Sequence, residues 1–521
     1  MTKFKKLLLL TFLLLGLISS QSLFADEYDV IRLKYKDYLT GGSTIDPLDP
    51  VIAVKIDQID TLTEQYWSSQ NANKVWDDCE TKSLTVPRKI GTMYRRLAIM
   101  AMAWATKGSQ YENNATLLAD TKSGLDWLYN NRYNETISQY GNWWWWDIGI
   151  PIRLLNATTI LWEQLTTSQV TNYSNAIAHF IPVPEKTGGN LTDTAFITAL
   201  RGILIKNSAT VQAGSDGVNP VFDYVTTGDG FYTDGSFIQH TYFAYARAYG
   251  QVLVTSLAKT LWLLKGSTWD NTDPDKGNIY KWIFDTYEPA LYKGQHLFTG
   301  SGRSLSRYGR TLLTAYGLFT SIYLLIEMPD NPYADDMKSL IKKHVQDSDT
   351  DIFYDKLSIW YYTKLKPIMD DASVTPRTPI TGNFVFYNQD TTHHHRSGWT
   401  FALSLHSDRI SNYESINNEN IKGWYQGDGM TYLYLNADDY LNHYMFTVDP
   451  HRMVGTTVDR DTSRTGVGSQ DKRSTKSFVG GTTNGTYGVT SMDFQQHDDE
   501  TMDVSAQKSW FMFDNEVVAL G

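Results

Sequence analysis

Residues 229–250 have the sequence DGFYTDGSFIQHTYFAYARAYG, and this stretch organises the rest of the chain. Two Asp-Gly turn signals, at Asp229 and Asp234, precede a single histidine, His240, and an aromatic run that contains Tyr249. An imidazole and a phenol can serve as an acid and base pair. On one continuous helix, nine residues turn about 900°, which would place the two side chains on opposite faces. For them to act together, His240 must lie in a turn or at the start of a helix. The alternative is that both are ordinary buried residues.

Length and composition indicate a globular protein with more than one domain. The chain has 521 residues, of which 41% are hydrophobic and 13% aromatic. Its formal net charge of −11 argues against nucleic acid as a partner. Residues 1–25 combine a lysine-rich start with the apolar run LLLLTFLLLGL, which is short for a membrane span and predicts a cleaved secretory signal. We therefore expect a secreted or periplasmic monomer that has no membrane attachment after cleavage.

Apolar residues recur at helical spacing through most of the region 26–365. The spacing predicts helices over 94–106, 151–165, 192–204, 241–264 and 310–326. Turn clusters separate these segments, a pattern that is typical of stacked helical hairpins. The periodicity itself leaves open whether the stack is a bundle, a solenoid or a closed ring.

The pattern changes after residues 366–382, which carry three prolines and are interpreted as a linker. In the region 383–521, apolar residues alternate with polar ones. Strands are predicted at 383–387, 399–405, 430–435, 487–490 and 509–520. Helices first and strands later predict separate domains rather than alternating βαβ units.

Five further segments strengthen this picture when they are taken with the stretch at 229–250. They are NWWWWDIGIP at 142–151, TGGNLTD at 187–193, SGRSLSR at 301–307, YESINNENIKGWYQGDGMTYLY at 413–434 and TVDPHRMVGTT at 447–457. In this order, the six segments resemble polysaccharide lyase family 8, which includes the hyaluronate, chondroitin AC and xanthan lyases. The resemblance implies an incomplete α/α toroid followed by an antiparallel β-sandwich. Family members generally continue well past this point, so we expect the β-sandwich to be incomplete at its C-terminal end.

The same resemblance implies which residues carry the chemistry. The catalytic residues would be Asn190, His240, Tyr249, Arg303, Arg307 and Glu414, and the substrate-binding residues Trp143, Trp144 and Asn417. A hydrogen beside a carboxylate is hard to remove, and donors aimed at the carboxylate stabilise the anion that develops. A free phenol has a pKa of about 10 and is a poor base at neutral pH, but nearby guanidinium charge favours the phenolate.

By residue type alone, several of these side chains have ordinary structural interpretations. Asn190 is also a typical helix cap, Glu414 a turn acid, and Arg303 and Arg307, with Arg310, a solvated basic turn. If residues 301–310 were helical, Arg303 and Arg307 would share a face. The four tryptophans at 143–146 would cover about 300° of a helix, so some must be exposed, and exposed aromatic rings often mark a binding surface.

The run of three histidines at 393–395 suggests a metal site only superficially. Consecutive residues of a strand point to alternate faces, so at most two of the three could share an ion. No cysteine or carboxylate spacing supports zinc, and the Gly427-Asp428-Gly429 turn lacks the further acidic ligands of a calcium loop. We therefore expect no metal and no organic cofactor.

The sequence thus predicts a secreted polysaccharide lyase that cleaves the bond at C4 of a uronic acid by β-elimination. Its acidic substrate would be of the hyaluronan, chondroitin or xanthan type, and the motifs do not distinguish these. One alternative is a glycoside hydrolase on an α/α toroid, with Asp229 and Asp234 as its two carboxylates. Another is a non-catalytic polysaccharide-binding protein that uses the tryptophans at 143–146.

Overall fold

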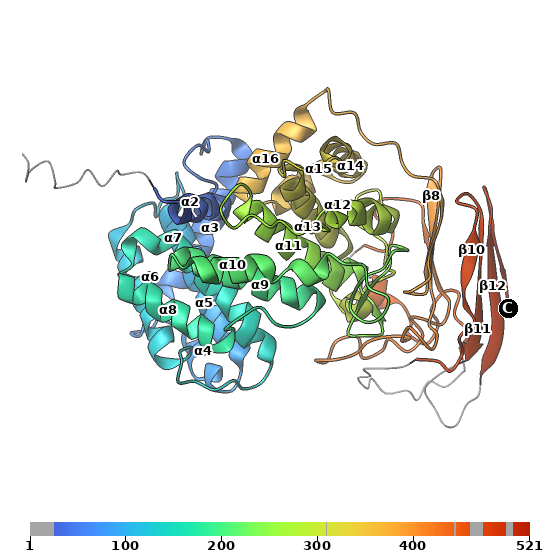
Figure 1. Ribbon diagram of the computed structural model, residues 1–521, viewed down its shortest axis with the longest axis horizontal. Helices are drawn as coiled ribbons and strands as arrows, with labels where there is room; N and C mark the ends of the chain where they lie inside the picture. The colour runs from blue at the N-terminus through green and yellow to red at the C-terminus, as the bar shows by residue number, and fades with distance from the viewer. Residues whose placement is uncertain (1–24, 309, 442–443, 459–472, 496–503) are drawn as a thin grey trace, which may run out of the picture.

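The computed structural model describes residues 25–308, 310–441, 444–458, 473–495 and 504–521. The predicted secretory signal at 1–25 lies outside these residues except for Ala25. Figure 1 shows two parts that follow one another along the chain, helices first and sheets at the C-terminal end. This order confirms the predicted fold class of a helical domain followed by antiparallel sheets. No helix within the described ranges is long and apolar enough to cross a bilayer.

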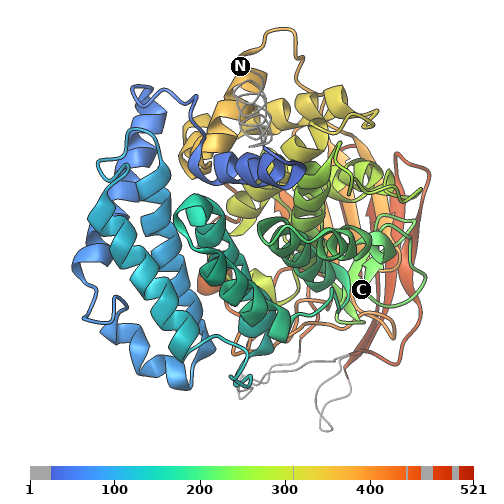
Figure 2. The ribbon, with the colours of Figure 1, turned by 60° about the vertical axis from the view of Figure 1, so that its left-hand side comes forward.

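Antiparallel helical hairpins build the first part, as Figure 2 shows. Its helices are α2 Glu27–Thr40, α3 Pro50–Ser68, α4 Asp77–Glu80, α5 Pro87–Ala105, α6 Ala115–Asn131, α7 Ile150–Leu161, α8 Thr167–Phe180, α9 Gly188–Leu204, α10 Ser208–Asp216, α11 Gln251–Leu264, α12 Asn278–Trp282, α13 Arg310–Ile326, α14 Ala334–Asp347, α15 Thr350–Lys356 and α16 Ile359–Asp370. Short 3₁₀ turns are η1 Lys82–Leu84, η3 Trp162–Gln164, η4 Asn219–Val221, η7 Glu288–Ala290 and η8 Gly302–Ser306. Single π-helical turns are η2 Trp145–Gly149, η5 Ala246–Gly250 and η6 Ile283–Tyr287.

Local sequence explains where these helices begin. The Asp49 carboxylate caps α3 by accepting hydrogen bonds from the first backbone N–H groups, and Pro50 follows at a position that needs no donor. Thr166 and Gln169 form a reciprocal capping box at α8. The entire length of α9 is buried, because it packs against α7, α10 and α11. The N-terminus of this buried helix carries Asn190, one of the candidate site residues.

The predicted helix at 241–264 is wrong in its first third. The structure has strand β2 Phe237–Gln239 paired with β3 Phe243–Ala244, then the π turn η5, and α11 starts only at Gln251. The reason is the backbone at His240 and Thr241, whose φ angles of 55° and 70° lie in the left-handed region. Two such residues in succession reverse the chain and exclude a continuous helix.

Two four-stranded antiparallel sheets form the second part. The first has the order β6 Gly382–Phe386, β7 Thr391–Arg396, β8 Trp399–Ser404 and β9 Met430–Tyr434. The second has the order β10 Val479–Thr483, β11 Gly488–Gln495, β12 Ser505–Met512 and β13 Val517–Leu520. Short pairs within the helical part are β1 Gly230–Phe231 with β2, and β4 Leu291–Tyr292 with β5 Gln295–His296. A further single-turn helix, α17 Tyr444–Thr447, follows β9.

Apolar side chains from both sheets fill the space between them. Alternate residues of β11 and β12, among them Met492, Phe494, Trp510 and Met512, pack against Phe401 of β8. The segment 509–520, predicted as one strand, is divided between β12 and β13 by a turn that Phe513 closes with Glu516.

The predicted linker at 366–382 begins within a helix, because α16 continues to Asp370 through Pro367. The first residues of the predicted 366–382 linker are therefore helical.

Buried hydrogen bonds join the two parts. The rings of His393 and His395, two residues apart on β7, both bind the carbonyl of Pro289 at 2.8 Å. Nε2 of His393 also meets the Thr299 hydroxyl at 2.6 Å. His394 points to the other face, where its Nε2 lies 2.8 Å from the Phe513 carbonyl. The alternation expected for a strand therefore holds, and the histidine run serves packing between the parts.

Candidate active site

The N-terminus of α9 brings Asn190 to the site. Gly188 has a φ of +53°, and a Cβ on it would lie 2.1 Å from Oε1 of Gln239. Gly189 donates its N–H to the same Oε1 at 3.3 Å, and a Cβ at Gly189 would lie 2.8 Å from the carbonyl oxygen of Tyr249. Glycine is therefore needed for this approach. Asn190, which is 8% exposed, is held beside the Tyr249 segment, and within the described chain its side chain makes no hydrogen bond.

The turn that carries His240 is held by Asp229. One carboxylate oxygen of Asp229 accepts from the Thr241 N–H at 2.7 Å, and the other accepts from Gln239 and Thr187. Asp234 accepts from Ser236 and from the backbone N–H of Asn388. Both aspartates are therefore occupied in shaping the loop. This geometry does not favour the hydrolase alternative, in which the two would flank a scissile bond.

The turn brings His240 and Tyr249 together, as the sequence required for a joint role. Their ring centroids are 4.8 Å apart, and the ring of Tyr245 lies 4.9 Å from that of Tyr249. Nδ1 of His240 is 2.5 Å from Oε1 of Glu414. Because a carboxylate accepts, Nδ1 carries the proton, and Nε2 is the ring nitrogen that a substrate can reach.

Arg303 connects these groups from η8. Each of its three guanidinium nitrogens donates to a different side chain. Nη2 donates to the Tyr249 hydroxyl at 3.1 Å, Nη1 to Oε2 of Glu414 at 2.7 Å, and Nε to Glu419 at 2.8 Å. The Tyr245 hydroxyl donates to Oε2 of Glu414 and accepts from the backbone N–H of Arg303 at 3.0 Å. A planar guanidinium fixes the directions of such donors.

Burial and charge set the protonation states in this network. Burial alone would raise the pKa of Glu414, but the His240 hydrogen bond and the Arg303 charge outweigh it and lower that pKa. Burial, followed by the charge of Glu414, raises the pKa of Tyr245 well above its ordinary value. Burial would lower the pKa of Arg303, yet the neighbouring oxygens raise it. Glu414 is therefore an anion, Arg303 a cation and Tyr245 a neutral phenol.

Glu419 joins the two arginines and was not identified from the sequence. Arg307 donates to it through Nε at 2.7 Å and Nη2 at 2.8 Å, and this pairing raises the pKa of Arg307. The arginines do not share a helix face, because η8 ends at Ser306 and Arg307 is extended. The side chain of Arg310 lies outside the described part of the chain. Glu419 falls in the quoted segment 413–434, where a second carboxylate is the signal that could have revealed it.

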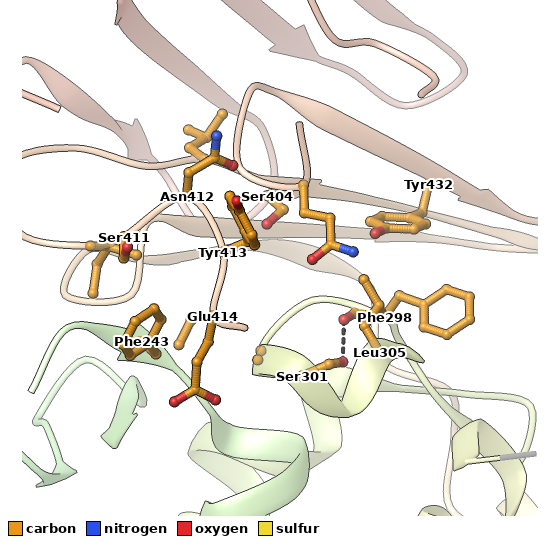
Figure 3. A pocket seen from close by; sticks show the side chains of 16 residues that line it. Phe243, Phe298, Ser301, Leu305, Ser404, Ser411, Asn412, Tyr413, Glu414 and Tyr432 are labelled. Atoms are coloured by element: carbon orange, nitrogen blue, oxygen red, sulfur yellow. Dashed lines mark hydrogen bonds between the residues drawn. The ribbon is translucent and has the colours of Figure 1, made fainter. Parts of the chain in front are cut away.

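A loop from the β part delivers both glutamates. Figure 3 shows Glu414 extending from this loop toward the helical part. Asn420 donates to the backbone carbonyl of Glu414 at 3.0 Å and exchanges two side-chain hydrogen bonds with Gln426. Asn417, by contrast, is exposed in a turn with a φ of 58°. The asparagine that contacts Glu414 is therefore Asn420, and the binding role of Asn417 stays a prediction.

A small cavity lies behind Glu414, where the two parts meet. Its volume is about 50 Å³, and it is lined from the helical part by Phe243, Phe298 and Ser301 and from the β part by Asn412 and Tyr432 among others. In Figure 3 the Ser301 hydroxyl donates to the carbonyl of Phe298 on its floor. The cavity is far too small for a saccharide, and its lining residues surround the loop that carries Glu414.

The four tryptophans divide between surface and core, as their number required. Trp143 is 39% exposed, Trp144 and Trp145 are half-buried, and Trp146 is fully buried with its indole N–H on the Tyr140 carbonyl. The π turn η2 lets the last of them enter the core. Trp143 and Trp144 therefore retain surface at the end of the segment that precedes α7.

No group of three or more His, Cys, Asp or Glu side chains suited to a metal ion occurs among the described residues. Burial lowers the pKa of His393 to about 3 and that of His395 to about 4, so both rings are neutral at ordinary pH. Their nitrogens are occupied by Pro289, Thr299 and Thr400. These histidines hold the interface between the two parts.

Comparisons with known proteins agree on one family. The model for "Polysaccharide lyase family 8, N terminal alpha-helical domain" matches residues 35–343, and that for "Polysaccharide lyase family 8, super-sandwich domain" matches residues 381–521. A xanthan lyase of Bacillus sp. (strain GL1) is 37% identical over 95% of this chain and 53% of its own length. A hyaluronate lyase of Thermasporomyces composti is 31% identical over 95% of this chain and 64% of its own length.

A solved structure extends this similarity to three dimensions. The chondroitin AC lyase of Streptomyces coelicolor A3, in complex with chondroitin sulphate, superposes with a TM-score of 0.88 at 30% identity, covering 95% of this chain and 69% of that one. The chain therefore spans about half to two thirds of the length of the curated relatives it matches.

Proposed function

The chain belongs to polysaccharide lyase family 8, and from this premise we propose that it cleaves uronic-acid-containing polysaccharides by β-elimination. The observation that carries the proposal is the single network of His240, Tyr249, Arg303 and Glu414, drawn from both parts of the molecule. Its phenol lies 3.1 Å from a guanidinium nitrogen and its ring 4.8 Å from the imidazole. This arrangement suits proton abstraction next to a carboxylate.

The reaction requires one proton to move and one bond to break. The Tyr249 oxygen, in its deprotonated form and hydrogen-bonded to Arg303, takes the proton from C5 of the uronate. The C4–O bond then breaks, a C4=C5 double bond forms, and Tyr249 returns the proton to the departing glycosidic oxygen. The products are an unsaturated uronate and a new hydroxyl end. No water or electron enters the balance.

The uronate carboxylate must be neutralised while C5 loses its proton. Asn190 is suited to this role because its side chain is held by the α9 terminus and is not engaged elsewhere in the described chain. His240 is the second group suited to this role, since its Nδ1 is bound to Glu414 and its Nε2 is left for the substrate. Together they stabilise the anion that develops on the carboxylate.

The two tyrosines of the site are not equivalent candidates for the base. Tyr245 is 1% exposed, and its hydroxyl is committed to the Glu414 carboxylate, which favours the neutral phenol. Tyr249 is half-buried, and its hydroxyl meets a cation. The less buried hydroxyl, which is not committed to a carboxylate, is the one that can exchange a proton with the substrate, so Tyr249 is the acid and base group and Tyr245 supports it.

Ultraviolet absorbance during incubation with hyaluronan, chondroitin and xanthan, each tested separately, measures this reaction. The conjugated double bond of the product should give a rise on at least one polymer, and the rise should be lost in Tyr249→Phe while circular dichroism remains unchanged. New reducing ends without absorbance would overturn the elimination and indicate a hydrolase. Binding without any product, equal in wild type and Tyr249→Phe, would indicate a binding protein.

The proposal extends to export and oligomeric state. The lysine-rich start and apolar run of residues 1–25 support secretion, which suits a polymer too large to enter a cell. We further propose that the protein acts as a monomer, since the network is completed within one chain. Size-exclusion chromatography with light scattering of the purified protein measures this.

A further inference from the structure

Lys186 lies beside Trp143, four residues before Asn190, and the catalytic network does not use it. Its ammonium sits 4.6 Å above the centroid of the Trp143 ring and 3.1 Å from Oδ2 of Asp147. The backbone of Lys186 has a φ of 115°, which side-chain-bearing residues rarely adopt. Such an outlier persists only where the surroundings hold it, and it is a reason to look for a function.

Asp147 fixes the position of this lysine. The Asp147 side chain is 7% exposed, and its second oxygen accepts from Nε2 of Gln139 at 2.7 Å. The carboxylate is therefore held on both sides and anchors the ammonium from below. The Lys186 side chain remains 37% exposed, and an ammonium has three donors, of which Asp147 takes one. The remaining donors are available to a ligand on the solvent side.

The location connects this pair to the reacting position. Lys186 precedes Asn190 by four residues, which limits the distance between their Cα atoms to about 14 Å. The intervening residues are fixed, because Thr187 donates to Asp229 at 2.7 Å and Gly189 binds Gln239. A polymer that reaches Asn190 along the Trp143 surface would pass this ammonium.

On the basis of the proposed function, we propose that Lys186 binds a carboxylate of the substrate on a sugar unit outside the reacting position. Trp143 is 39% exposed and offers a flat ring to a sugar, and the ammonium that lies over this ring offers a cation for the acid group. A local cation is needed because the chain as a whole carries a net charge of −11 and would repel an acidic polymer. Asp147 positions Lys186 and does not touch the substrate.

Steady-state kinetics of four variants test this role, on whichever of hyaluronan, chondroitin and xanthan the wild type cleaves. We expect Lys186→Gln to raise KM roughly tenfold with kcat nearly unchanged, as for the loss of one charge-assisted contact. Lys186→Arg should stay close to wild type. Asp147→Asn keeps the ammonium but weakens its anchor, so KM should rise less than in Lys186→Gln. Lys338→Gln, at a half-buried lysine paired with Asp335 on α14, removes the same charge elsewhere and should leave KM unchanged.

Salt and stability measurements separate binding from a structural role. Added NaCl should raise the KM of the wild type more than that of Lys186→Gln, because salt screens the contact. If Lys186→Gln lowers the Tm by leaving Asp147 unpaired, the double variant with Asp147→Asn should recover the Tm and keep the high KM. Equal rises in KM for Lys186→Gln and Asp147→Asn would overturn the inference. A KM of Lys186→Gln equal to that of Lys338→Gln would also overturn it. A wild type that cleaves none of the three polymers would instead overturn the proposed function, and the inference with it.

Discussion

At the scale of single residues, the site depends on which partner each hydroxyl and carboxylate has. Tyr245 and Tyr249 are four residues apart and chemically identical, yet one hydroxyl meets a carboxylate and the other a guanidinium. Arg303 contacts both, so its orientation decides the chemistry of the pair. Composition and spacing make the two tyrosines equal, and only their partners distinguish them.

The two tyrosines should therefore respond differently to the same substitution. Tyr249→Phe removes the proton-transfer group and should reduce kcat by roughly 10²–10⁴-fold. Tyr245→Phe removes a supporting hydroxyl and should reduce kcat by roughly tenfold, because Glu414 and Arg303 still contact each other directly. Initial rates of absorbance change measure both. Equal losses in the two variants would contradict the assignment of Tyr249 as the acid and base group.

Glu419 should matter because it holds both arginines. Glu419→Gln keeps the size of the side chain but removes the charge that binds Nε of Arg303 and of Arg307. We expect a roughly tenfold loss in kcat/KM, corresponding to about 1–2 kcal/mol for a charge-assisted hydrogen bond that is partly exposed. Glu516→Gln, in the exposed turn between β12 and β13, provides the control for the same change of charge. Unchanged kinetics in Glu419→Gln would mean that the arginines orient themselves without it.

At the scale of elements, the site is made where the α9 terminus meets the loop at 229–250. Gly188 and Gly189 allow this approach, and Gln239 and Asp229 seal it with hydrogen bonds. The left-handed pair His240 and Thr241 then turns the chain so that His240 faces Tyr249. The fit between a helix end and a loop, rather than any single residue, places Asn190 beside the segment that carries Tyr249.

This fit predicts a large effect of a small substitution at Gly188. Gly188→Ala adds a Cβ 2.1 Å from Gln239 in a backbone with positive φ, so both the turn and the neighbouring amide must shift. Gly266→Ala is the matched control, because its φ is +73° and nothing lies within 4 Å of the added atom. Left-handed strain costs each variant about 1 kcal/mol. We expect only Gly188→Ala to lower kcat/KM, and we expect its Tm, measured by differential scanning calorimetry, to fall below that of Gly266→Ala. Equal Tm values for the two variants, with full activity in both, would refute the tight fit.

At the scale of the whole molecule, the site exists only while the two parts stay together. Glu414 and Glu419 come from the β part, whereas Arg303, Tyr249 and Asn190 come from the helical part. Buried neutral histidines are part of what joins them, since His393 and His395 share the Pro289 carbonyl. The network is therefore sensitive to any condition that charges these rings.

Acid should destabilise the molecule before ordinary carboxylates titrate. Burial lowers the pKa of His393 and His296 to about 3 and that of His395 to about 4, below the value of about 6.5 in an unfolded chain. Below pH 6.5 the unfolded state binds protons that the folded state refuses, so each ring costs about 1.4 kcal/mol per pH unit down to its folded pKa. Burial raises the pKa of Asp193 and Asp390 to about 6, and below pH 6 their protonation partly offsets the loss.

Three histidines outweigh two aspartates, so the net effect remains a loss of stability between pH 6.5 and about 4. The urea midpoint should fall between pH 7 and pH 5, most steeply from pH 6.5 to 6, where the aspartates do not yet contribute. His395→Gln should flatten this dependence. Equal midpoints at pH 7 and pH 5 would show that these rings are not neutral in the folded protein.

Sequence patterns alone indicated the order of the parts and the family, and they supplied the candidate site residues as predictions. Helical and alternating periodicities are local properties of the sequence, and the order of motifs along the chain can be recognised without knowledge of the fold. The sequence also predicted correctly that His240 must precede the helix if it is to meet Tyr249, because nine residues on a helix separate the two faces.

The tertiary structure decided which of those side chains meet, because contacts between distant segments have no local signature. Glu419 lies 116 residues from Arg303, and Glu414 lies 174 from His240, so no spacing rule brings them together. The same limit explains why Asn420 rather than Asn417 contacts Glu414, and why the histidine run joins the two parts. The late start of α11 arose from two left-handed residues, whose backbone is set by the loop that Asp229 holds.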